Sequence, residues 1–141
     1  MIVRLASHRV GRRAIAVLLV AGVRLALHTA PARTLRTLHQ SCNGSPRRAN
    51  RLYPRRVDTL RQLAESIDRG ARMMSGPFDF AQGGTCLVSA LASCVAARLL
   101  RTPVRLRLGV HQVRPDLRAH AWVECAGAVL ASGASSLAFD R

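Results

Sequence analysis

The spacing of apolar residues predicts two helices in the middle of the chain. Residues 57–74 place apolar side chains at three- and four-residue steps, which is typical of an amphipathic helix with one face in the core. Residues 86–100 carry no charge from Cys86 through Ala97, so this second helix is expected to be the central buried one. On the first helix, the predicted core positions are Val57, Leu60, Leu63, Ala64, Ile67 and Ala71.

The last third of the chain changes to a period of two. Residues 104–108 alternate Val and Leu with Arg, and residues 119–126 alternate again after a turn expected at 112–118. Ala126-Gly127 then offers a tight turn into a further strand. Helices followed by about three antiparallel strands predict an α+β fold.

The N-terminal segment contains ten uncharged residues, 14–23, between Arg13 and Arg24. A membrane-spanning helix needs about 20 apolar residues, and Arg24 interrupts the run at half that length. A secretory signal would need a cleavage site, which Ala30-Pro31-Ala32 imitates, although Arg24 and the proline fit it poorly. We expect instead a helix packed on the domain or on a partner, able to lie on a membrane surface.

Charge is unevenly distributed along the 141 residues. All 22 basic residues are arginine, seven residues are acidic, and the formal charge is +15. Twelve arginines precede Asp58, the first acidic residue. We therefore predict a basic, partly helical segment at 1–54 and a core at 55–141. An excess made only of arginine can also reflect GC-rich codons.

The basic half lacks the features of a nucleic-acid-binding domain. Tyr53 is its one aromatic residue, and no helix-turn-helix, zinc-finger or RNA-stacking pattern is present. A nucleic-acid partner is therefore not expected. The arginines are better explained by a surface that docks a partner or faces a membrane.

Cys86 is a candidate nucleophile because of its position at a helix start. With Thr85 as N-cap, the sulfur would lie where backbone N–H groups and the positive end of the helix dipole favour a thiolate. His120, at the start of a strand, could remove the thiol proton. Each residue also has a purely structural interpretation, as a small apolar residue and as a hydrogen-bonded strand histidine.

Residues 84–132 resemble the transglutaminase-like cysteine peptidases of lasso-peptide biosynthesis, which are bacterial leader peptidases. The resemblance rests on the Cys86-Leu87 helix start, the Leu-Leu-Arg helix end at 99–101, the strand 106–110, and His-Ala-Trp-Val-Glu at 120–124 before a turn glycine. The arginine-rich N-terminus and the length resemble the stand-alone, B2-type form of this family. The implied fold is a transglutaminase/papain-like core made of helices followed by a small antiparallel sheet.

The resemblance implies removal of a leader peptide, with Cys86 attacking the carbonyl of the last leader residue and His120 acting as general base. The implied partners are the precursor, a separate leader-recognition protein and an ATP-dependent lasso cyclase, and the implied location is cytoplasmic with possible membrane contact. The family pattern also has an aspartate about twelve residues after the histidine, where this chain has Ser132. Asp140 lies too near the end of the chain to be assigned, and Gln82 is a candidate second oxyanion donor beside the Cys86 N–H.

The remaining polar residues suggest no further chemistry. Trp122 shares a strand face with His120, where it could shield the imidazole, pack in the core or lie at the rim of the site. No metal or other cofactor is expected, because the cysteines and histidines lack metal-ligand spacing. We expect packing or surface roles for Cys42, Cys94, Cys125, His8, His28, His39 and His111.

Overall fold

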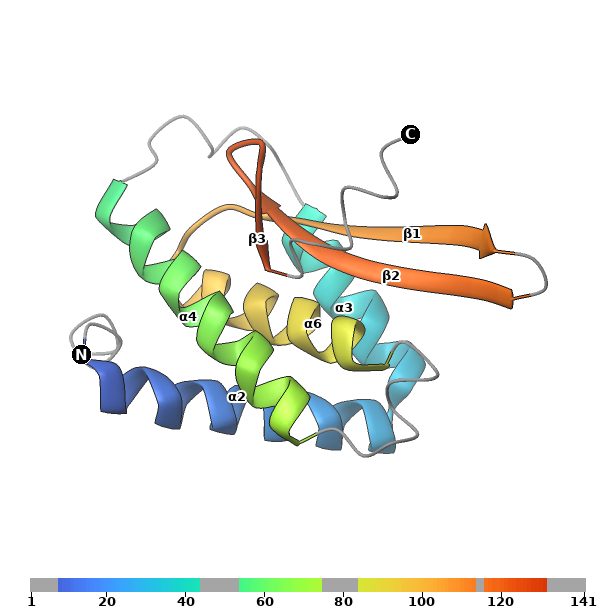
Figure 1. Ribbon diagram of the computed structural model, residues 1–141, viewed down its shortest axis with the longest axis horizontal. Helices are drawn as coiled ribbons and strands as arrows, with labels where there is room; N and C mark the ends of the chain where they lie inside the picture. Colours follow the sequence, from blue (N-terminus) through green and yellow to red (C-terminus); the bar gives the residue numbers. More distant parts are fainter. Residues whose placement is uncertain (1–7, 44–53, 75–83, 114–115, 132–141) are drawn as a thin grey trace.

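The computed structural model describes residues 8–43, 54–74, 84–113 and 116–131, and the fold is α+β (Figure 1). Four helices precede a three-stranded antiparallel sheet in these residues. The helices are α2 (Arg9–Thr29), α3 (Pro31–Asn43), α4 (Pro54–Met73) and α6 (Gly84–Leu99). The strands are β1 (Arg105–Val113), β2 (Asp116–Cys125) and β3 (Ala128–Ala131).

The N-terminal segment forms two helices where the sequence pattern predicted one. The break falls at Ala30, whose φ of −150° and ψ of 67° are not helical. Pro31 explains the break, since proline disfavours a helical conformation in the preceding residue and is well suited to the first position of a new helix. Thr34 fastens the junction by donating hydrogen bonds to the carbonyls of Ala26 (3.1 Å) and Ala30 (2.9 Å).

Helix α6 is the central buried helix, as predicted, and α4 packs on it with the one apolar face that its pattern predicted. Of the core positions predicted on α4, all but Val57 are fully buried, and Val57 packs against the core from its edge. Helix α4 begins three residues earlier than predicted, with Pro54 as its first residue, a position where the missing N–H costs nothing. Helix α6 is buried along most of its length, and its Ser89 hydroxyl donates to Asp68 Oδ1 of α4 at 3.2 Å.

The sheet has the order β1-β2-β3, with β2 in the middle. The turn expected at 112–118 is shorter than predicted, because β1 and β2 stay paired as far as Val113 and Asp116. The tight turn at 126–127 is confirmed: both residues have positive φ, 52° and 80°, as in a type I′ hairpin. At the outer edge of β1, Asn43 of α3 bonds Leu106 twice, accepting from its N–H (3.1 Å) and donating to its carbonyl (3.3 Å).

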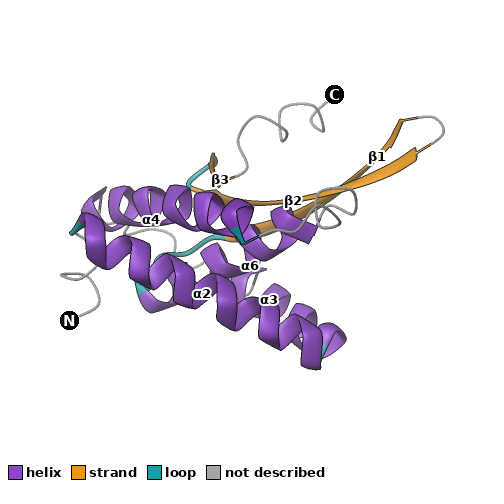
Figure 2. Cartoon of the chain, turned by 60° about the horizontal axis from the view of Figure 1, so that its bottom comes forward, coloured by secondary structure: helices purple, strands orange, loops and turns teal. Residues whose placement is uncertain are grey.

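Helix α2 packs on α4 and α6, on the side of α6 away from the sheet (Figure 1). Ala16, Val20 and Val23 of α2 are buried in the same cluster as the α4 and α6 core, so the predicted packing of this helix on the domain is confirmed. The division of the chain at residues 54/55 stays a prediction. In the second view, α2 lies on the side of the molecule away from the strands (Figure 2), whereas the C-terminal end of α3 reaches β1. None of the described helices is long and apolar enough to cross a membrane.

Candidate active site

Cys86 lies in the first turn of α6 and is partly exposed. The prediction that Thr85 caps this helix is wrong, because the helix already begins at Gly84 and Thr85 belongs to its first turn. Cys86 is therefore the third helical residue. Its backbone still lies in the turn whose N–H groups point out of the helix end, and the positive end of the helix dipole lies there too.

The thiol of Cys86 meets strand β2 immediately before His120. The sulfur lies 4.0 Å from the carbonyl oxygen of Ala119. The backbone N–H and C=O of Leu106 bind Asn43 and so point away from β2. In an antiparallel pair this direction alternates, so Val110, four residues later, also points away from β2. Its partner Ala119 therefore points its backbone groups away from β1. The Ala119 carbonyl thus faces the other edge of β2, beyond the end of β3, where the first turn of α6 packs. The fold brings the two predicted catalytic residues to one edge of the sheet.

The His120 imidazole stacks on the Trp122 indole, with ring centroids 5.8 Å apart and planes inclined by 22°. The two residues are two apart on β2 and so share a face of the sheet, opposite to the buried Ala121, Val123 and Cys125. Trp122 is itself buried, at 8% exposure. Of the roles left open for Trp122, the structure shows the indole covering one side of the imidazole.

Two further residues fix the Trp122 indole. Its Nε1–H donates to Glu124 Oε1 at 3.0 Å, and Arg107 Nε on the neighbouring strand donates to Glu124 Oε2 at 3.1 Å. Burial raises the pKa of Glu124, but the hydrogen bonds from Trp122 and Arg107 and the charges of Arg107 and Arg105 outweigh it, so the pKa lies below its usual value. Glu124 is therefore held as a carboxylate, and the line Arg107–Glu124–Trp122–His120 runs along one face of the sheet.

Sequence reasoning left Arg107 out of this site, and it placed Glu124 on the strand face of His120 and Trp122 without assigning it a role. A period of two places Glu124 on the His120 face, but Arg107 joins it only through the register that sets Arg107 opposite Trp122. That register depends on the length of the turn between β1 and β2. Because the turn was predicted too long, the sequence pattern did not indicate that Arg107 lies opposite Trp122.

The other residues considered for the site are not brought to it. Gln82, Ser132 and Asp140 lie outside the described residues, as does the side chain of His111. His8, just before α2, His28 on α2 and His39 on α3 are all exposed. The three remaining cysteines, Cys42, Cys94 and Cys125, are free and buried.

Cys42 and Cys94 pair with each other in the core between α3 and α6. A hydrogen bond with Cys94 lowers the pKa of Cys42; burial opposes this and the charge of Arg98 adds to it. The same hydrogen bond, followed by burial, raises the pKa of Cys94. This pair therefore has a packing role between α3 and α6. In the described part of the chain, no three His, Cys, Asp or Glu side chains gather closely enough to hold a metal ion.

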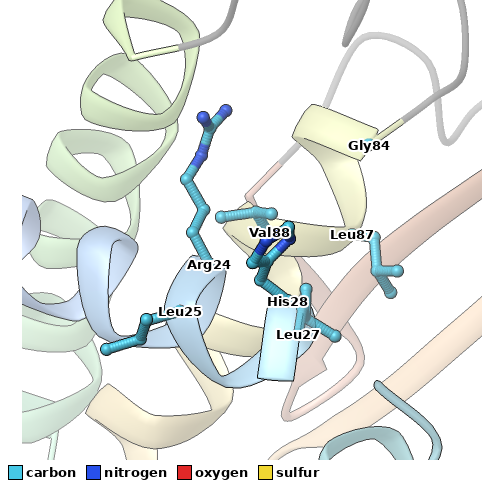
Figure 3. Close-up of a pocket in the computed structure, with 7 residues that line it drawn as sticks. All are labelled: Arg24, Leu25, Leu27, His28, Gly84, Leu87 and Val88. Carbon is cyan, nitrogen blue, oxygen red and sulfur yellow. The ribbon is translucent and has the colours of Figure 1, made fainter. Parts of the chain in front are cut away.

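A pocket of about 560 Å³ opens between the C-terminal part of α2 and the first turns of α6 (Figure 3). Its walls include Gly84, Leu87 and Val88 of α6, with Arg24 and His28 from α2. Residues at positions i, i+3 and i+4 share one helix face, and Cys86 falls on nearly the opposite face. The pocket is therefore separate from the thiol.

Comparison with known proteins identifies the family. The profile of the transglutaminase-like superfamily matches residues 15–140, which covers α2 from Ile15 onward and every other described helix and strand. Neither the curated proteins nor the solved structures compared with the chain include a match. The matched region covers most of the chain and contains Cys86, whose sulfur contacts the carbonyl of the residue before His120. The chain therefore belongs to the transglutaminase-like superfamily, which includes cysteine peptidases.

Proposed function

We propose that the protein is a cysteine peptidase that removes the leader from a ribosomally made lasso-peptide precursor. The observation that carries the proposal is the contact of the Cys86 sulfur, 4.0 Å, with the carbonyl of the residue preceding His120. Family membership supports the chemistry, and the resemblance of residues 84–132 to lasso leader peptidases supports the substrate.

The reaction begins when His120 takes the thiol proton and the Cys86 sulfur attacks the carbonyl carbon of the last leader residue. The developing oxyanion is stabilised by the Cys86 backbone N–H at the positive end of α6. His120 then gives its proton to the departing amine of the core peptide, leaving the leader as a thioester on Cys86. Water, deprotonated by His120, hydrolyses this thioester and restores the thiol.

The Trp122 and Glu124 side chains serve this cycle by positioning the imidazole. The stacked indole restricts ring rotation, and the Glu124 carboxylate fixes the indole. Because stacking does not determine which imidazole nitrogen carries the proton, this arrangement does not replace the aspartate of the family pattern.

The reaction places the protein within a set of partners. Leader release frees an amino terminus that an ATP-dependent cyclase can join to an acidic side chain, so the protein would act with that cyclase, the precursor and a leader-recognition protein. We place this activity in the cytoplasm, where the precursor is made.

The second candidate function is a scaffold of the same pathway with impaired catalysis. It is favoured by Ser132, because a hydroxyl at the position of the family's aspartate cannot offset the charge of an imidazolium. Incubating the matched precursor with the protein, with and without the recognition protein, and weighing the products separates the two candidates. The peptidase releases leader and core as two masses, faster with the recognition protein present. An intact precursor in the presence of every component, with the protein shown to be folded, would support the scaffold.

A further inference from the structure

The outward face of α2 is apolar for most of its length. Leu18 is 72% exposed, Leu25 65% and Val17 48%, and Val10, one turn before Ala14, is 81% exposed. From residue 14 to residue 25, no exposed position of α2 carries a polar side chain. Those positions are Ala14, Val17, Leu18, Ala21, Gly22 and Leu25.

These positions form one continuous stripe. They follow one another at steps of one, three and four residues, so they lie on the side of α2 opposite Ala16, Val20 and Val23, which enter the core. An exposed apolar stripe of this length on an outer helix indicates an interaction surface.

A groove of about 430 Å³ between α2 and α3 extends this surface. Leu18, Leu19 and Val23 of α2 form one wall, and Leu38 of α3 faces them. Arg33 also lines the groove, so its guanidinium accompanies the apolar surface. The stripe therefore continues sideways into an apolar hollow with a cation beside it.

The charges that α2 and α3 carry are all positive. Helices α2 and α3 contain six arginines and no acidic residue, and Arg9, Arg13, Arg33 and Arg36 are exposed. A second copy of the chain placed against this face would bring like charges together. A surface that combines an apolar interior with anionic groups matches both the stripe and the arginines.

We propose that the outward face of α2 binds the surface of membranes containing anionic lipids. The helix has 21 residues and is about 31 Å long, and it would lie in the plane of the interface, with Leu18 and Leu25 among the acyl chains and the arginines at the phosphates. Helix α2 lies away from the sheet that carries His120 (Figure 2), so the precursor would reach the site from the aqueous side. This inference does not depend on catalysis by Cys86.

The test is co-sedimentation of the full-length protein with vesicles of phosphatidylcholine alone and of phosphatidylcholine mixed with phosphatidylglycerol. We expect binding to the mixed vesicles that weakens with added salt, and little binding to phosphatidylcholine alone. The double variant Leu18→Gln/Leu25→Gln should lower the partition coefficient about tenfold or more. Arg33→Gln/Arg36→Gln, which removes two exposed arginines of α3, should weaken binding to the mixed vesicles and leave binding to phosphatidylcholine alone unchanged.

The matched control is Met73→Gln, which removes an apolar side chain of 87% exposure from α4 and should bind vesicles like the parent. Cys86→Ala should also bind like the parent, which separates this proposal from the catalytic one. No sedimentation with mixed vesicles, or equal binding by the Leu18→Gln/Leu25→Gln variant, would overturn the proposal. A dimer of the parent that this double variant abolishes, without vesicle binding, would assign the stripe to a second copy.

Discussion

Cys86 differs from the other cysteines in its access to solvent. Cys42, Cys94 and Cys125 are buried in the core, whereas Cys86 is partly exposed at a helix end. Reactivity of a thiol requires both access and thiolate character. Burial raises the pKa of Cys125, and the charge of Arg61 opposes this with a smaller effect. Cys125 therefore has neither the access nor the thiolate character that a reactive thiol needs.

Cys86 should therefore react first with iodoacetamide, at least about tenfold faster than any of the three buried cysteines in the native protein. Peptide mapping by mass spectrometry after short exposure gives the order of labelling. In Cys86→Ser the fast phase should disappear. Fast labelling of Cys42 or Cys125, with Cys86 left unmodified, would contradict the assigned position of the thiol.

Glu124 should make stability depend on pH. Its pKa is depressed in the folded state, so its contribution is present above its ordinary value of 4.5 and is lost as the pH falls through the folded value. The ion pair between Arg107 and Glu124 is partly exposed, with 51% and 26% side-chain exposure. We therefore expect Glu124→Gln to lower the free energy of unfolding by about 0.5–1 kcal/mol at pH 7.

Urea unfolding of the parent and of Glu124→Gln at pH 7 and below pH 4 measures this difference, which should shrink at the lower pH. The control is Glu65→Gln on the exposed side of α4, for which a change within about 0.5 kcal/mol is expected at pH 7. A Glu124→Gln difference that stays constant or grows on acidification would refute the assigned ion pair.

At the scale of the elements, the turn between β2 and β3 carries local strain. Ala126 has φ of 52° and Gly127 has φ of 80°, and only glycine, asparagine and aspartate adopt such values readily. We predict that Ala126→Asn stabilises the protein by about 0.5–1 kcal/mol and that Gly127→Ala destabilises it by about 1 kcal/mol or more. Thermal unfolding followed by circular dichroism measures both. The same sign for the two substitutions would contradict the turn type.

Sequence reasoning succeeded for elements whose pattern is local. The three- and four-residue steps of α4 and the uncharged stretch of α6 specify their own burial, and Gly127 specifies the tight turn. It failed where the outcome depends on a neighbour in space. The pairing of Arg107 with Glu124 depends on the register of two strands. The same limit applies to the site: types and order of residues suggested Cys86 and His120, but the stacking of Trp122 required the fold.

At the scale of the whole molecule, α2 is part of the central core even though its outer face is apolar and exposed. Val20 is fully buried among residues of the α4 and α6 cluster. The arginine excess is concentrated in the half of the chain that contains this helix, away from Cys86 and His120 in the sequence. Helices α2 and α3 carry six of the 22 arginines and no acidic residue, so a basic surface accounts for more of the net charge than the candidate site does.

Val20→Ala should lower the free energy of unfolding by about 2 kcal/mol and shift a single cooperative transition. Val10→Ala is the matched control, because it removes the same atoms from an 81% exposed position of the same helix, and it should have almost no effect. Chemical denaturation followed by the fluorescence of Trp122, a residue far from α2 in the chain, measures the free energy of unfolding of both variants. An unchanged Trp122 transition in Val20→Ala would show that α2 unfolds independently of the core.

The most direct test of the central claim is the rate of cleavage of a matched precursor, with the recognition protein present, by the parent, Cys86→Ala, His120→Ala and Cys125→Ala. Cys86 and His120 act on the same reacting atoms, so each of their substitutions should slow the appearance of the free leader mass by about a thousandfold or more. Cys125→Ala, which removes a buried thiol from the same strand as His120, should retain activity within about tenfold. Cleavage by Cys86→Ala at the parent rate would contradict the assignment of Cys86 as nucleophile.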